Sequence, residues 1–215
     1  MYTICISWQF GRALWSLVLW CLFCCKKIFL FSFYLTKAEI IGLTWDCIDF
    51  DNGMIVVAKT LCYLPNNGDA VYEFHLPKTK AGKRKIPMSK KVKEMLLEQK
   101  RWHDNVAKSY KAVPGFEDLV FTSKTNHPLN ATNIKDSINY LIARINLENP
   151  DIEFEHFTPH CLRHTFATNC IEKGMRPKTL QKILGHNSLQ MTMDLYCHVH
   201  DEVLKEEMAA IIEMV

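Results

Sequence analysis

Residues 158–170 read TPHCLRHTFATNC and residues 184–196 read LGHNSLQMTMDLY, and these two stretches decide the fold. Thr158 is a good N-cap and Pro159 suits the first helical position, so a helix should begin here and end near Gly174. Apolar residues fall on one stripe of this helix and would bury that side in a core. Another side of the helix is therefore free to carry polar groups.

The first helix presents two groups that suit a phosphate. His160 and Arg163 are three residues apart and therefore project from the same side. Arginine can hold two phosphate oxygens with its planar fork, and histidine can donate a hydrogen bond or move a proton. His160 and His164 also have the i, i+4 spacing of a zinc helix, but no glutamate follows His160, so we expect no metal.

Two further helices complete the set. The second should begin at Pro177 and end at Gly185, so that the turn exposes His186. The third should span residues 188–199 and hold Tyr196, because tyrosine can act as a covalent nucleophile. Two histidines, an arginine and a tyrosine that converge on one point suit attack by a phenolic oxygen on a phosphodiester.

The chain from residue 36 onward reads as one domain without repeats or low-complexity linkers. Hydrophobic periodicity and turn residues place the remaining elements. We expect a helix over 37–45, a hairpin over 47–58, strands over 71–76 and 84–87 with a turn around Ala81-Gly82, and helices over 89–106 and 130–145. The sequence therefore predicts an α+β fold, mostly helical, with a small three-stranded antiparallel sheet.

Positive charge is concentrated in the middle of the chain. The formal net charge is only +3, but residues 78–111 hold twelve Lys or Arg against three Asp or Glu. A basic run is often no more than a solvated surface. Beside a phosphate-handling site, contact with a DNA backbone explains it better.

Cysteine usage points to a reducing compartment. The nine cysteines are odd in number and irregular in spacing, and no clean secretory signal precedes them, so we expect a cytoplasmic protein. Cys21 and Cys24 have a C-x-x-C spacing, but a second pair is missing and zinc is not expected there.

The N-terminal segment differs from the rest. Residues 13–25 and 28–35 are apolar and are separated by Lys26-Lys27, so a membrane span would carry two lysines near its middle. A core helix, a membrane-associated helix and sequence foreign to the domain all remain open. We favour the third, which divides the chain into an atypical segment 1–35 and a domain 36–215.

The ordered set of motifs closely resembles the tyrosine recombinases, the phage-integrase and transposon-integrase family of DNA strand-exchange enzymes. The resemblance covers roughly residues 38–199 and is strongest in its last third. Residues 42–50 are similar to the family segment that follows its first catalytic arginine, and residues 77–87 look like its β-hairpin lysine segment. The resemblance implies a tyrosine-recombinase catalytic domain that acts on double-stranded DNA as a homo-oligomer, a tetramer, without a cofactor.

The resemblance also implies residue roles. Tyr196 would attack the scissile phosphate and form a 3′-phosphotyrosyl link, and Arg163 would neutralise the phosphate. His160 would assist proton transfer, His186 would donate a hydrogen bond, and Lys78 would protonate the leaving oxygen, with Lys80 as the alternative acid. The residues expected to contact DNA are Lys80, Lys83, Arg84 and Lys85.

One departure from the family lies at residue 36. The family places an arginine three residues before the glutamate that Glu39 matches, and Thr36 stands there instead. Lys37 is one residue away, about 100° around a helix, and lysine cannot form a bidentate clamp. A frame shift or a truncated gene would explain both this loss and the foreign N-terminus, and would leave a copy that recombines poorly.

Two other functions are weighed against recombination. A DNA-binding module without chemistry could use the last two helices as a helix-turn-helix, and a membrane-anchored structural protein is a third possibility. We expect no membrane partner. A final amphipathic helix over 201–215 would dock either on its own domain or on a neighbouring protomer.

Overall fold

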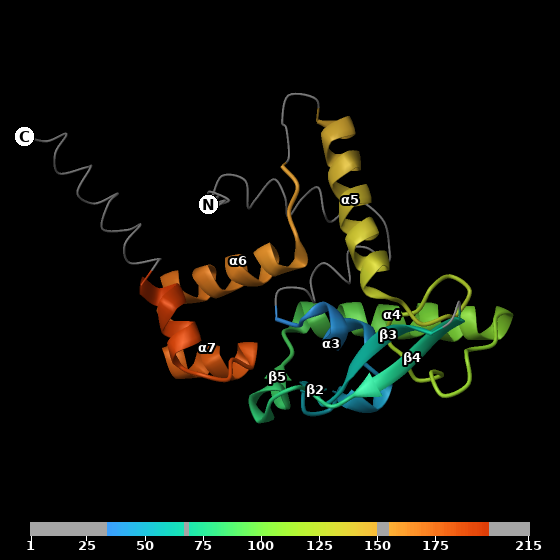
Figure 1. Cartoon of the computed structure of the whole chain (residues 1–215), viewed down its shortest axis with the longest axis horizontal. Coiled ribbons are helices and arrows are strands. Elements are labelled where there is room, and N and C mark those ends of the chain that lie inside the picture. Colours follow the sequence, from blue (N-terminus) through green and yellow to red (C-terminus); the bar gives the residue numbers. More distant parts are fainter. Residues whose placement is uncertain (1–33, 67–68, 150–154, 198–215) are drawn as a thin grey trace, which may run out of the picture.

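The structure is a computed structural model that describes residues 34–66, 69–149 and 155–197. Helices dominate it, and a small antiparallel sheet lies on one side (Figure 1). The expected α+β fold is confirmed. The C-terminal helix predicted over 201–215 and nearly all of segment 1–35 lie outside the described residues.

The three-stranded sheet joins distant parts of the chain. Its strands are β1 (Ile48–Asp49), β2 (Met54–Val57) and β5 (Arg84–Pro87), in the antiparallel order β1-β2-β5. Gly53 has a φ of +66° in the turn between the first two strands, where glycine carries no steric cost. On β5 the side chains alternate between buried and exposed, so Arg84 and Ile86 face inward while Lys83 and Lys85 face solvent.

A separate two-stranded hairpin corrects the expected strand pairing. Strand β4 (Asp69–His75) pairs with β3 (Thr60–Asn66), a strand that we did not expect, rather than with β5. The register Asn66↔Asp69 leaves a two-residue connection, and Asn67-Gly68 is the sequence signal for such a hairpin. Pro77 and a 3-10 turn at Lys80–Gly82 separate β4 from β5, so the turn around Ala81-Gly82 does not join two paired strands.

The main core is built by helices around the sheet. These are α3 (Lys37–Ile41), α4 (Lys90–Ser109) and α5 (Ala131–Glu148). The side chains of Ser89 and Asn130 cap α4 and α5 at the expected starts. The innermost residues, all at most 1% exposed, include Ile40, Ile55, Leu96, Phe121, Ile134 and Leu141.

The C-terminal helices form a second, smaller apolar cluster. Helix α6 (Pro159–Glu172) and helix α7 (Pro177–Leu184) pack together, and residues 190–197 are helical as far as they are described. Their buried side chains include Cys170, Leu180 and Leu184, with Leu195 and Tyr196 packed against them. Because α7 also contacts β5, this cluster is held against the edge of the sheet (Figure 1).

The segment before α3 belongs to the packed structure. Leu35 is buried in the main core, and the ring of Tyr34 meets Phe166 of α6 edge-on at 5.3 Å between centroids. No helix within residues 34–66, 69–149 and 155–197 has the length and hydropathy to cross a membrane.

Candidate active site

Helix α6 carries the first two predicted catalytic residues. Thr158 caps it through a hydrogen bond from the backbone N–H of Cys161, and Pro159 occupies the first turn, as the sequence predicts. Leu162 and Ala167 are buried, which fixes the helix on the protein. Arg163 is half-buried and His160 is exposed at the helix start.

Arg163 is held by backbone carbonyls. Its Nη1 donates to the carbonyl oxygen of Tyr34 at 2.9 Å, and its Nη2 donates to that of Leu184. Burial, together with the nearby cation of Arg84, lowers the pKa of Arg163 to about 10, while Glu39 acts in the opposite direction. Arg163 therefore stays charged at neutral pH and is anchored on both sides by main-chain groups.

The two histidines of α6 contact each other. Nε2 of His160 and Nε2 of His164 lie 2.8 Å apart, and the rings meet edge-on. Burial and the neighbouring charges of His160 and Arg163 lower the pKa of His164. One ring must donate and the other accept, so the pair can hold one proton between them. Among the described residues no group of three or more metal-ligating side chains occurs.

His186 follows the end of α7. Gly185 closes that helix with a left-handed φ of +69°, and His186 comes next, as predicted. Its Nδ1 lies 3.0 Å from Oγ1 of the fully buried Thr192. Burial lowers the pKa of His186 to about 4, and the surrounding positive charges, Arg163 first among them, act the same way. The ring is therefore neutral at pH 7, with a fixed orientation.

Tyr196 lies on the helical residues 190–197 and is turned toward the protein. Its hydroxyl donates a hydrogen bond to the carbonyl oxygen of Met175, in the connection between α6 and α7. Its ring packs on the second apolar cluster, and burial raises the pKa of the phenol. In this arrangement the hydroxyl is bonded to the backbone and not to Arg163 or His186.

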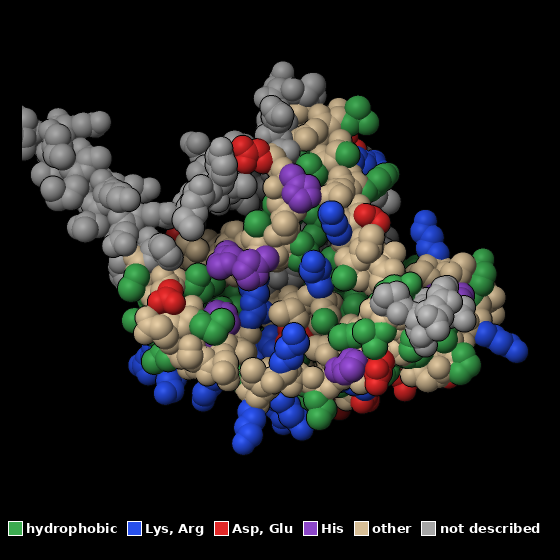
Figure 2. Space-filling view, in the orientation of Figure 1, with side chains coloured by type: hydrophobic (Ala, Val, Ile, Leu, Met, Phe, Trp, Pro, Cys, Tyr) green, Lys and Arg blue, Asp and Glu red, His purple; other side chains and the backbone are tan. Residues whose placement is uncertain are grey.

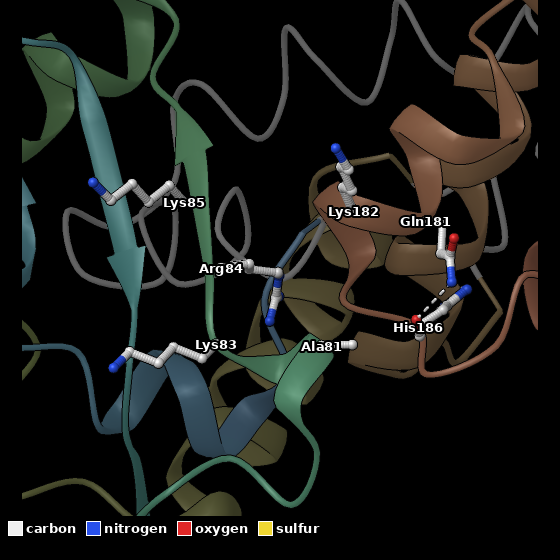
Figure 3. A pocket seen from close by; sticks show the side chains of 7 residues that line it. All are labelled: Ala81, Lys83, Arg84, Lys85, Gln181, Lys182 and His186. Atoms are coloured by element: carbon white, nitrogen blue, oxygen red, sulfur yellow. Dashed lines mark hydrogen bonds between the residues drawn. The ribbon is translucent and has the colours of Figure 1, made fainter.

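The basic segment 78–85 divides into exposed lysines and one buried arginine. Lys78, Lys80, Lys83 and Lys85 are exposed, whereas the side chain of Arg84 is only 6% exposed. A hollow of about 360 Å³ lies between β5 and α7, lined by Ala81, Lys83, Arg84, Lys85, Gln181, Lys182 and His186. Figure 3 shows Arg84 pointing to the opposite side of β5 from Lys83 and Lys85.

Position 36 serves as a helix cap. The Thr36 hydroxyl accepts from the backbone N–H of Glu39, and the backbone N–H of Thr36 donates to the Glu39 carboxylate at 2.7 Å. This reciprocal arrangement is a capping box. Lys37 is exposed in the first turn of α3. The short polar side chain of Thr36 therefore serves the local backbone.

The structure gathers part of the predicted set. Arg163, His160, His164 and His186 lie close enough for their charges to act on one another, and Figure 2 shows histidines beside Lys and Arg side chains on one face. Tyr196 packs on the second apolar cluster and bonds to the Met175 carbonyl, and Lys78 makes no hydrogen bond or ion pair within the described part of the chain.

Sequence reasoning missed two supporting groups. The Tyr34 carbonyl is a main-chain acceptor whose partners lie 50 and 129 residues away, so local sequence gives no signal for it. Thr192 was detectable in principle, since it falls inside the motif that ends at Tyr196.

Comparison with known proteins matches residues 29–203 to the family described as the phage integrase family. The chain belongs to this family. The match covers most of the chain and spans α6, α7 and Tyr196, so it favours an integrase over a DNA-binding module without chemistry. The curated relatives include proteins that are named tyrosine recombinases.

Curated relatives of this integrase-family chain include recombination enzymes of mobile elements. The transposase from transposon Tn916 of Enterococcus faecalis is 34% identical over 172 residues, which is 80% of this chain and 41% of the transposase. A tyrosine recombinase XerC-like protein of Caldanaerobacter subterraneus subsp. tengcongensis is 29% identical, over 81% of this chain and 45% of that protein. The chain thus spans less than half the length of these relatives.

A solved integrase has the same fold. The Tn1549 transposon integrase, in complex with transposon right end DNA, superposes with a TM-score of 0.77 and 27% identity. The alignment covers 99% of this chain and 67% of that one. The architecture of this integrase-family chain is therefore that of a tyrosine-recombinase catalytic domain.

Proposed function

We propose that this chain is the catalytic part of a site-specific DNA recombinase, which cleaves and rejoins strands of double-stranded DNA through a 3′-phosphotyrosyl intermediate. The single observation that carries the proposal is the anchored guanidinium of Arg163 beside His160 and His186, in a chain that belongs to the integrase family. A relative named a transposase and a solved integrase in complex with transposon right end DNA support the substrate class.

Each group in the proposed reaction makes or breaks one bond. The phenolic oxygen of Tyr196 attacks the scissile phosphorus, and the bond from phosphorus to the 5′ oxygen breaks as the phosphotyrosyl bond forms. Lys78, or Lys80 in its place, gives a proton to the departing 5′ oxygen. The released 5′-hydroxyl of a partner strand then attacks the phosphotyrosine in the reverse reaction.

Arg163 neutralises the charge that develops on the phosphate oxygens. Its Nε and one N–H on each terminal nitrogen have no partner among residues 34–66, 69–149 and 155–197, so three donors are available. His186 is neutral at pH 7 and can donate a hydrogen bond to the phosphate from Nε2 when Nδ1 accepts from Thr192. The His160–His164 pair accepts the proton of Tyr196.

Two movements are required before cleavage. The Tyr196 hydroxyl must leave the Met175 carbonyl, and DNA must enter between the basic segment 78–85 and α6–α7. Lys80, Lys83 and Lys85 are exposed and able to contact the DNA backbone, whereas Arg84 is buried. Assembly as a tetramer on DNA and a location in the cytoplasm remain part of this proposal.

The activity of this copy should be low. Thr36 occupies the position of a catalytic arginine, and the loss of one such charge stabiliser costs about 10²–10³ in rate. We therefore expect DNA binding with slow cleavage. The foreign character of residues 1–35 is proposed on the same grounds, although the Tyr34 carbonyl takes part in the site and Leu35 is buried in the core.

The covalent step can be trapped without knowledge of the target sequence. Nicked duplexes of randomised sequence lose the short strand on cleavage, so a phosphotyrosyl adduct accumulates and survives denaturation. We expect an adduct for the wild-type chain and none for Tyr196→Phe, which lacks only the phenolic oxygen. An adduct that persists in Tyr196→Phe would refute the assignment of the nucleophile.

A further inference from the structure

Arg84 is a buried charged side chain that the proposed chemistry does not use. Its guanidinium lies between β5, the start of α3 and the end of α7, as seen at the centre of Figure 3. Its ion pair with Glu39 has a shortest N–O distance of 2.6 Å, and both side chains are at most 7% exposed. A buried charge is tolerated only when it is paired and its donors are satisfied.

All five N–H groups of Arg84 have protein acceptors. Two of the bonds, from Nη1 and Nη2, go to the two carboxylate oxygens of Glu39. The others go to backbone carbonyl oxygens: Nε to Ile183 at 2.7 Å, Nη1 to Gly82 at 3.0 Å and Nη2 to Tyr34 at 2.9 Å. An arginine has five such donors, so none remains for a DNA phosphate.

Arg84 and Arg163 share their acceptors. The Tyr34 carbonyl accepts from both guanidinium groups. At the end of α7 they bond successive carbonyls, Arg84 that of Ile183 and Arg163 that of Leu184. The carbonyl end of a helix is the negative end of its dipole, which suits two neighbouring cations.

The turn before His186 also rests on Arg84. A Cβ atom at Gly185 would lie 2.9 Å from Nη1 of Arg84 and 3.1 Å from its Cδ. The glycine therefore permits close packing of the turn on the guanidinium, in addition to its left-handed φ. Arg84 thus contacts the backbone on both sides of the phosphate site.

We propose that Arg84 is a positioning residue, which fixes the carbonyls that orient Arg163 and the turn that presents His186, and which does not itself touch DNA. This inference rests on the proposed function. It replaces the sequence-based expectation that Arg84 contacts DNA together with Lys80, Lys83 and Lys85. A planar fork is required at this position, because a lysine could reach only part of the acceptor set.

The test follows individual arginines in the full-length chain. The Nε–H signals of ¹⁵N-labelled arginine are recorded by NMR during titration with inorganic phosphate, and substitution to lysine at residues 84 and 163 assigns the two signals. In the wild-type chain we expect the Arg163 signal to shift and saturate while the Arg84 signal stays in place. In Arg84→Lys the phosphate affinity at Arg163 should fall about tenfold, as expected when one charge-assisted hydrogen bond is lost.

A control separates positioning from general stability. Leu96 is fully buried in α4, remote in sequence from every residue of the network, and Leu96→Ala should lower the melting temperature. Its phosphate affinity at Arg163 should match the wild-type value. If Arg84→Lys does not fold, Glu39→Gln takes its place, with a smaller loss of affinity expected.

Each outcome decides between the two proposals. An Arg84 signal that titrates together with Arg163 would make Arg84 a direct phosphate ligand and overturn its positioning role. Unchanged affinity in Arg84→Lys or in its substitute Glu39→Gln, or an equal loss in Leu96→Ala, would overturn it as well. If Arg163 itself gives no response in the wild-type chain, the proposed function fails at its phosphate ligand. Should neither variant fold, the wild-type titration decides alone, with the Arg84 signal assigned through bonds from its backbone amide. A static Arg84 signal beside a moving Arg163 signal then supports the inference.

Discussion

The start of α6 and the start of α3 lie against the same carbonyl but offer a phosphate very different groups. Helix α6 supplies Arg163, whose guanidinium reaches the Tyr34 carbonyl and keeps three donors without a partner in the described structure. Two residues after Tyr34, Thr36 caps α3 with a short side chain that carries no charge. One side of the site is thus equipped for phosphate, and the other stabilises its own helix.

The comparison shows what Thr36 contributes to the fold. A threonine at the N-cap stabilises a helix by about 0.5–2 kcal/mol relative to alanine, so Thr36 stabilises the backbone locally. The buried pair of Glu39 and Arg84 still joins α3 to β5 and α7. Folding therefore does not require an arginine at position 36.

The largest effect on the rate of adduct formation is expected for Arg163, on the side of the site that can bind phosphate. Arg163→Lys keeps the charge but cannot reach two carbonyls and a phosphate together, and should lower the rate of adduct formation by about 10²–10³. The rate is measured with the nicked duplexes described above. A rate equal to that of the wild-type chain would contradict the assignment of phosphate binding to the start of α6 rather than the start of α3.

Substitution of two glycines on the phosphate-binding side of the site separates the effect of backbone strain from the effect of close packing. Gly174 and Gly185 have φ values of +74° and +69°, but only the second would bring a Cβ atom against Arg84. Gly174→Ala should cost about 1–2 kcal/mol from the left-handed backbone alone. Gly185→Ala should cost more and should also slow adduct formation. Thermal unfolding measures both, at about 2–4 °C per kcal/mol for a chain of this size, and equal losses would contradict the packing of the turn on Arg84.

The smallest effect concerns pH. The pKa of His186 is lowered to about 4, so the unfolded chain, with a histidine pKa of about 6.5, takes up the proton first as pH falls. The folded state should therefore lose stability between those two values and lose no more from this group below the lower one. Melting temperatures measured from pH 7 to pH 4 should fall more steeply for the wild-type chain than for His186→Asn. His164 shifts in the same direction and remains in both chains, so parallel curves would contradict the assignment to His186.

Much of the C-terminal half could be predicted because its signals are local. Thr158, Pro159, Gly174 and Gly185 mark helix ends through backbone chemistry that depends only on neighbouring residues, and α6 and α7 begin and end as expected. The order of His160, Arg163, His186 and Tyr196 along the chain was sufficient to recognise the family.

The remainder depended on contacts between distant residues. Strand β4 pairs with β3 and not with β5. This pairing follows from the two-residue connection at 67–68 and not from the sequence of β4. In the sequence, nothing distinguishes Arg84 from the basic residues Lys83 and Lys85 on either side of it. Its burial follows from the alternation of β5 combined with a carboxylate 45 residues earlier, and sequence spacing does not reveal that pairing.

The central claim is that this integrase site lacks one guanidinium, at position 36. The most direct test compares the rates of adduct formation of Thr36→Arg and Lys37→Arg on the same nicked duplexes. We expect Thr36→Arg to raise the rate by about 10²–10³ and to lower the melting temperature through loss of the cap, while Lys37→Arg changes neither. Equal rates for the two variants would contradict the account.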